Sequence, residues 1–78
     1  LKLNEVNIRL PKNSSKDLMN DIVNLAKNNT GDHLFIVHIP SDNEGERKIV
    51  SKKMKVSNNN QFLILLRDLL GESNVWID

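Results

Sequence analysis

The chain has 78 residues, a formal net charge of +1 and no cysteine. This length suits one small domain over residues 1–78, and neither a disulfide nor a cysteine–zinc site can add to its stability. The longest apolar run, from Phe62 to Leu66, is too short to cross a bilayer, so no membrane partner is expected. A charge near zero also argues against a protein held on polyanions by electrostatics alone. Leu1 in place of methionine suggests a piece cut from a longer chain.

The first segment, from Val6 to Leu10, alternates apolar and polar residues and predicts a half-buried strand. Pro11 ends this strand, and Ser14 or Ser15 then offers an N-cap for a helix over residues 16–29. Gly31 is expected to adopt the left-handed conformation that often follows a helix. The apolar residues of the helix fall within one arc, namely Leu18, Met19, Ile22, Val23, Leu25 and Ala26.

The next segment, from Leu34 to Ile39, is apolar on both faces and predicts a central strand. Residues 41–46 are polar and have hairpin character, which places Glu44 and Glu46 in a loop. A return strand follows from Arg47 to Val56, with a break expected near residues 51–53. The central strand must turn one of two sets away from the helices: Leu34, Ile36 and His38, or Phe35, Val37 and Ile39.

Ser57 is the predicted N-cap of a second helix over residues 58–70, and Gly71 lies just beyond its end. Residues 75–77 form a short last strand. If its first and third residues face the helices, Trp76 lies on the open face of the sheet. The buried arc of the second helix is expected to contain Phe62, Leu63, Leu65, Leu66, Leu69 and Leu70.

The resulting element order is β-α-β-β-α-β. It predicts an α+β fold, a two-layer sandwich with both helices on one face of a small mixed sheet.

The sequence offers little of the chemistry that an enzyme needs. His33 and His38 are the only histidines, and five-residue spacing on a strand sends their side chains to opposite faces. The three glycines are isolated and form no phosphate loop. We therefore expect no catalytic residues, no metal and no cofactor in this chain.

Nucleic-acid binding is an alternative, because the element order is also that of the RNA recognition motif. That module stacks bases on aromatic residues of its strands, whereas the return strand here has none. The return strand is instead basic. One explanation of this positive charge is that lysines keep a solvent-exposed strand edge from aggregating. The other explanation is that the lysines contact phosphates. The candidate nucleic-acid-binding residues are Lys48, Lys52, Lys53 and Lys55.

A protein-interaction surface is the more productive hypothesis. Ile64 lies in the centre of the polar arc of the second helix, with Arg67 beside it. Trp76 is expected on an open sheet face that needs a cover, and Ile77 follows it. Ile64, Arg67, Trp76 and Ile77 are therefore the candidate partner-binding residues.

Taken together, these segments resemble the C-terminal domain of the bacterial DNA polymerase III alpha subunit, over residues 6–78. Lys55, where arginine is common in that family, and the run Asn58–Asn60 depart from its pattern. The matching pieces are Val6-Asn7-Ile8-Arg9-Leu10-Pro11, a helix ending before Gly31, the strand Leu34 to Ile39, Met54-Lys55-Val56-Ser57, Leu65-Leu66-Arg67-Asp68-Leu69-Leu70-Gly71 and Val75-Trp76-Ile77-Asp78.

The resemblance implies a role in docking rather than a reaction. In that family the polymerase aspartates and a single-strand-binding OB domain lie upstream, and the C-terminal domain binds the tau subunit of the clamp loader. It implies a cytoplasmic location in the bacterial replisome and two partners, tau and the preceding OB domain of the parent chain. The parent chain would be a DNA-directed DNA polymerase, a nucleotidyltransferase, and this part of it would be noncatalytic. A weak contact with DNA stays open.

Overall fold

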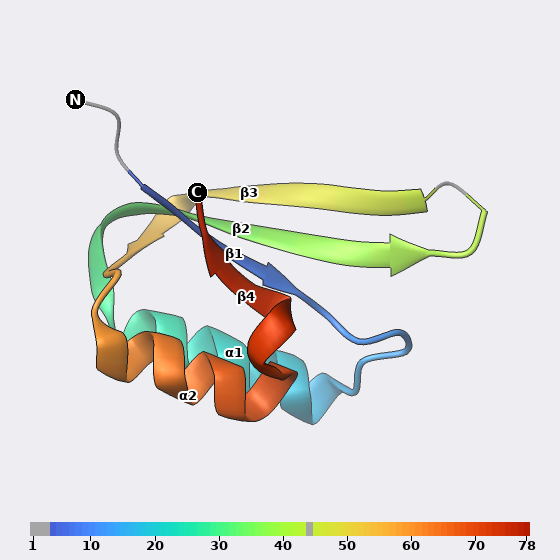
Figure 1. Cartoon of the computed structure of the whole chain (residues 1–78), viewed down its shortest axis with the longest axis horizontal. Coiled ribbons are helices and arrows are strands. Elements are labelled where there is room, and N and C mark those ends of the chain that lie inside the picture. The colour runs from blue at the N-terminus through green and yellow to red at the C-terminus, as the bar shows by residue number, and fades with distance from the viewer. Residues whose placement is uncertain (1–3, 44) are drawn as a thin grey trace.

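A computed structural model describes residues 4–43 and 45–78 of the chain. Two helices cover one face of a four-stranded sheet (Figure 1), so the expected α+β sandwich is confirmed. The elements in chain order are β1 (Glu5–Arg9), α1 (Lys16–Lys27), β2 (Thr30–Ser41), β3 (Gly45–Val56), α2 (Asn60–Leu70), a single 3₁₀ turn η1 (Glu72–Asn74) and β4 (Val75–Ile77).

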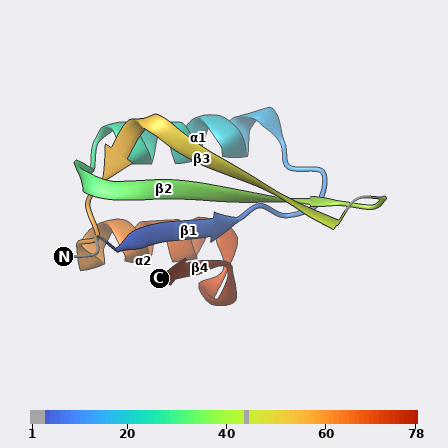
Figure 2. The same cartoon turned by 90° about the horizontal axis from the view of Figure 1, so that it is seen from above.

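The strands lie in the order β3-β2-β1-β4. β1 runs parallel to β2, while β3 and β4 are antiparallel to their neighbours, which makes the sheet mixed. The two ends of the described chain meet beside β1, since Glu5 and Asp78 each donate a backbone N–H to the other's carbonyl at 3.0 Å. Viewed from above the sheet (Figure 2), α1 lies behind β3, and α2 lies behind β1 and β4.

The core lies between the sheet and the helices. Val6, Ile8 and Leu10 are buried there, as the alternation in β1 predicts. On the central strand Phe35 faces the helices, and its ring lies 6.3 Å from that of Phe62 on α2. The rest of the buried cluster is Ile22, Ala26, Val56, Leu63, Leu66, Leu70 and Val75.

The start of α1 follows the sequence prediction, and its end does not. Ser15 is the N-cap, and its hydroxyl accepts a hydrogen bond from the Leu18 N–H at 3.1 Å. The helix ends at Asn28, which keeps right-handed helical angles, so the expected left-handed cap at Gly31 is wrong. Gly31 belongs to β2, and a β-carbon there would lie 2.7 Å from backbone atoms of Val56 and Ser57. Glycine is needed at this position for a close backbone crossing.

The second helix also begins differently from the prediction. Its N-cap is Asn59 rather than Ser57, and the Asn59 side chain accepts from the Phe62 N–H at 2.8 Å. The Ser57 hydroxyl instead accepts hydrogen bonds from Asn59. Gly71 ends the helix at a φ of +95°, as its position beyond the last leucine predicts.

Part of each predicted apolar arc is exposed. Among residues 4–43 and 45–78, α1 and α2 alone form the second layer, so no described element covers the side of each helix that faces away from the sheet. The prediction of a fully buried arc on the second helix is therefore wrong for Leu65 and Leu69, which are 45% and 38% exposed. On α1, Met19 and Val23 of the apolar arc are 37% and 39% exposed.

The hairpin of β2 and β3 is the longest part of the sheet, and both strands extend beyond their predicted ends. Its ladder is irregular where the sequence predicts a break. Phe35 pairs with Ser51, but His33 pairs with Val56, so two steps along β2 correspond to five along β3. Residues 52–55 consequently form a bulged stretch without regular partners.

Candidate functional site

The open face of the sheet carries a cluster of polar and aromatic side chains from all four strands. The register places Trp76 beside Asn7, and Arg9 beside His38. Of the two alternatives left open for the central strand, the set with Leu34, Ile36 and His38 therefore faces away from the helices. Trp76 lies on this face, and Val75 is buried on the other, as predicted. We call Asn7, Arg9, His38, Glu46 and Trp76 the open-face cluster.

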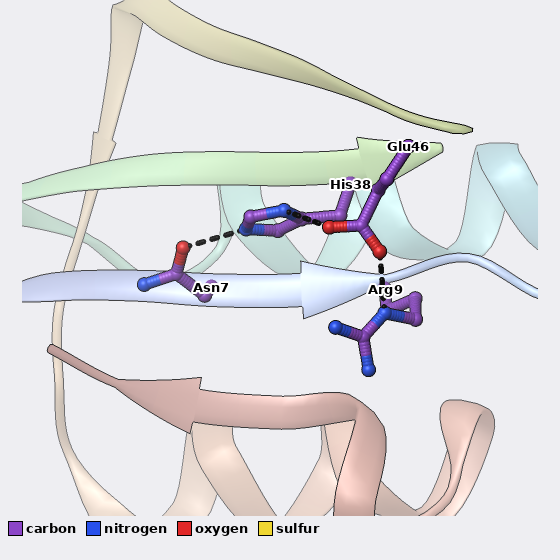
Figure 3. A network of polar contacts seen from close by, with 4 residues as sticks. All are labelled: Asn7, Arg9, His38 and Glu46. Atoms are coloured by element: carbon purple, nitrogen blue, oxygen red, sulfur yellow. Dashed lines mark hydrogen bonds and ion pairs between the residues drawn. The ribbon is translucent and has the colours of Figure 1, made fainter. Parts of the chain in front are cut away.

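Hydrogen bonds connect this cluster across three strands (Figure 3). The Glu46 carboxylate accepts from Arg9 Nε at 2.7 Å and contacts His38 Nδ1 at 2.8 Å. His38 Nε2 lies 2.8 Å from Asn7 Oδ1. The amide of Asn7, which is 1% exposed, donates to the Glu5 carbonyl at 3.3 Å. The rings of His38 and Trp76 are 4.8 Å apart, and the Arg9 guanidinium lies 4.9 Å from the Trp76 ring centre.

Glu46 therefore does not lie in the loop to which the sequence analysis assigns it. It lies in β3, and its backbone pairs with Pro40. The hydrogen bond from Arg9, followed by that from His38, holds the pKa of the Glu46 carboxyl below its usual value of 4.5. Glu44, the other glutamate assigned to this loop, lies outside the described residues.

Both ring nitrogens of His38 face oxygen atoms of neighbouring side chains, Glu46 at Nδ1 and Asn7 at Nε2. The hydrogen bond that the Asn7 amide donates to the Glu5 carbonyl turns the Asn7 carbonyl oxygen toward the ring. Trp76 packs against the His38 ring and the Arg9 guanidinium of this network.

The histidines do not gather with carboxylates into a metal site. His33 Nδ1 lies 3.1 Å from the Asn4 carbonyl oxygen, and His38 is used in the open-face cluster. Within residues 4–43 and 45–78, no three histidine, aspartate or glutamate side chains are grouped so that they could hold a metal ion.

A second surface runs over the outer side of the helices, and we call it the helical surface. Ile64 is its most exposed apolar residue, with 55% of its area accessible, as expected from its place in the polar arc. Leu65 is shared by two neighbouring hollows, one toward Gln61 and Ile64 and one of about 400 Å³ between α1 and α2. The apolar residues of this surface are Leu25, Ile64, Leu65 and Leu69, and the charged ones are Asp21, Arg67, Asp68 and Glu72.

The four candidate partner-binding residues do not form one surface. Ile64 and Arg67 line the same hollow on α2. Trp76 lies on the open face of the sheet, which is on the other side of the molecule from the helices (Figure 1). Ile77 alternates with Trp76 along β4 and is 37% exposed. Sequence reasoning missed Leu65 and Leu69, which it assigned to the core.

The basic residues of β3 are divided as well. Lys48 pairs with His38 toward the hairpin turn. Lys52, Lys53 and Lys55 lie in the bulged stretch at the other end of the strand, where they line a hollow of about 530 Å³ together with Lys27 of α1. Thr30, Gly31 and Met54 complete the described lining. We call this feature the lysine hollow.

Comparison with protein-family models, with curated proteins and with solved structures finds no match. Neither α1 nor α2 is long and apolar enough to cross a membrane.

Proposed function

We propose that this chain is a noncatalytic docking domain at the C-terminus of a bacterial replicative DNA polymerase, the polymerase III alpha subunit. Its partner would be the tau subunit of the clamp loader, and the preceding OB domain of the parent chain would adjoin it. The resemblance in the sequence suggests this role. The α+β sandwich agrees with the fold that the resemblance and the residue pattern lead us to expect.

The observation that carries a docking role is the helical surface. Ile64, Leu65 and Leu69 expose 55%, 45% and 38% of their area side by side on one helix. Scattered exposed apolar residues are ordinary, but contiguous ones bordered by polar groups are typical of protein interfaces. Three carboxylates and one arginine border this surface, which favours a tau segment with apolar and basic side chains.

Ile64 and Arg67 are the proposed contacts on the helical surface. Trp76 is the proposed contact on the open face of the sheet, and Ile77, which alternates with it along the edge strand β4, is the fourth proposed contact. Buried aromatic and aliphatic anchors usually dominate interface energetics, so Ile64 and Trp76 are the two residues to test first. The open-face cluster supports Trp76 as an anchor, because a side chain already held in one orientation loses little freedom on binding.

Isothermal titration of purified tau against this chain tests the proposal. We expect a Kd below about 1 µM for the wild type, and a weaker affinity for a well-folded wild type would contradict tau docking. Loss of a hot spot costs about 2 kcal/mol or more, so Ile64→Asp should weaken binding by about 30-fold.

A matched control is available on the strand that lies farthest from α2 in the sheet. Ile49 of β3 is 46% exposed, so Ile49→Asp makes the same change away from the helical surface and should leave the affinity unchanged. Titration of Trp76→Ala then tests the open face separately. An unchanged affinity in that variant would remove Trp76 from the interface and leave the helical surface as the docking site.

A further inference from the structure

The lysine hollow lies at the end of the molecule where α1 leads into β2 and β3 leads into α2 (Figure 1). Its four lysines come from two elements that are distant in the sequence. None of its described lining residues carries a carboxylate. The ion pairs among the described residues that need no histidine charge are those of Arg9 and Lys12, and none involves any of the four lysines.

Protection of a strand edge does not account for this arrangement. Lysines that only discourage edge-to-edge pairing need no common direction, and Lys27 belongs to a helix. On a regular strand the side chains of Lys52 and Lys53 would point to opposite faces. In the bulged stretch both line the same hollow. The bulged stretch and the end of α1 therefore bring four lysines to the lining of one hollow.

Positive and negative charges are also segregated over the molecule. The net charge of the chain is only +1, yet the lysine hollow is basic and the helical surface has three carboxylates for one arginine. The positive charges of four lysines in the lining of one hollow repel each other, and a bound anion would relieve this repulsion. The lining has no aromatic side chain on which a base could stack, so contact would be with phosphates and independent of sequence.

We propose that the lysine hollow binds the phosphate backbone of a nucleic acid. Its described lining has four lysines and no carboxylate, so its charge is complementary to that of a row of phosphates. Half-buried Met54 is the only large apolar residue of the described lining, which leaves little to insert into a lipid surface. This site is separate from the helical surface and does not depend on tau docking.

Fluorescence anisotropy with a labelled oligothymidylate at 50 and 200 mM salt tests the site. Four phosphate contacts on a single strand give a slope of about −2.8 in log K against log salt concentration, which weakens wild-type binding by about 50-fold over this range. The variant Lys27→Ala/Lys53→Ala should bind more weakly at 50 mM salt. Its affinity for the oligonucleotide should fall only about 7-fold between the two salt concentrations, because two phosphate contacts remain.

The control variant Lys16→Ala/Lys48→Ala removes the same charge from the opposite end of α1 and from the part of β3 near the hairpin turn. It should bind as the wild type does. Equal weakening by both variants would overturn the site, and so would failure of the wild type to bind at 50 mM salt. Binding to anionic lipid vesicles without binding to the oligonucleotide would also overturn it. Titration of tau against the Lys27→Ala/Lys53→Ala variant separates phosphate binding from tau docking, since the affinity of this variant for tau should equal that of the wild type.

Discussion

Replacement of Gly31 by alanine should destabilise the fold, although this substitution often stabilises proteins. Gly31 lies where β2 passes the junction of β3 and α2, and the Ser57 N–H donates to the Asn29 carbonyl beside it at 2.8 Å. A β-carbon at Gly31 would lie 2.7 Å from the Val56 carbonyl oxygen and from Ser57 N and Cα. All three are backbone atoms, so no side chain can rotate away to make room.

Two effects of opposite sign determine the size of the change. Forcing an extra carbon into a packed site costs about 1–3 kcal/mol. The φ of Gly31 is not positive, so alanine is otherwise tolerated and gains about 0.4–1 kcal/mol from the reduced freedom of the unfolded chain. The expected net loss is about 1–2 kcal/mol, which lowers the Tm of a domain of this size by about 4–16 °C.

Urea unfolding followed by the fluorescence of Trp76 measures this loss. Thr30→Ala is the control, because Thr30 is exposed and adjacent, and its stability should stay within about 0.5 kcal/mol of the wild type. A Gly31→Ala variant as stable as the wild type, or more stable, would show that the two segments separate easily. The close crossing would then not be the reason for glycine at this position.

Two further predictions concern the open-face cluster and the core. The pKa of Glu46 is lower in the folded protein than its usual value of 4.5, so its ionised carboxylate stabilises the fold above about pH 4.5. This stabilisation is lost as the pH falls through the pKa of the folded state. Urea midpoints of the wild type and Glu46→Gln should therefore differ at pH 7 and converge near pH 3. Phe62→Ala should lower the unfolding free energy by about 3–5 kcal/mol, measured by urea denaturation, because Phe62 is fully buried against Phe35.

The sequence predicts much of this fold because the elements have clear periodicity. Alternation in β1 assigns Val6 and Ile8 to the core, and a glycine after the last leucine of α2 marks its end. The failures occur where a distant segment decides the outcome. Gly31 has the sequence position of a helix cap, but its role is set by the backbone at Val56, 25 positions later.

The candidate surfaces were harder to predict from the sequence, because they too depend on segments that are distant along the chain. A helical arc shows that Leu65 and Leu69 are on the apolar side of α2, but not that the helical layer is too narrow to cover them. Composition reveals the lysines of β3, but the irregular pairing of β3 with β2, and the hollow that three of these lysines line together with Lys27, depend on the folded structure. Glu46 was assigned to a loop because the sequence does not show how far the hairpin extends.

The position of β1 constrains the order in which this domain can assemble. β1 lies between β2 and β4, so it pairs on one side with the middle of the sequence and on the other with residues 75–77. Until those residues pair with it, β1 is an edge strand whose backbone groups on that side, such as the N–H and carbonyl of Glu5 that bond to Asp78 in the folded domain, are unpaired. A chain lacking its last four residues would keep both helices and the hairpin but leave this edge open. We expect this truncated chain to aggregate through β1.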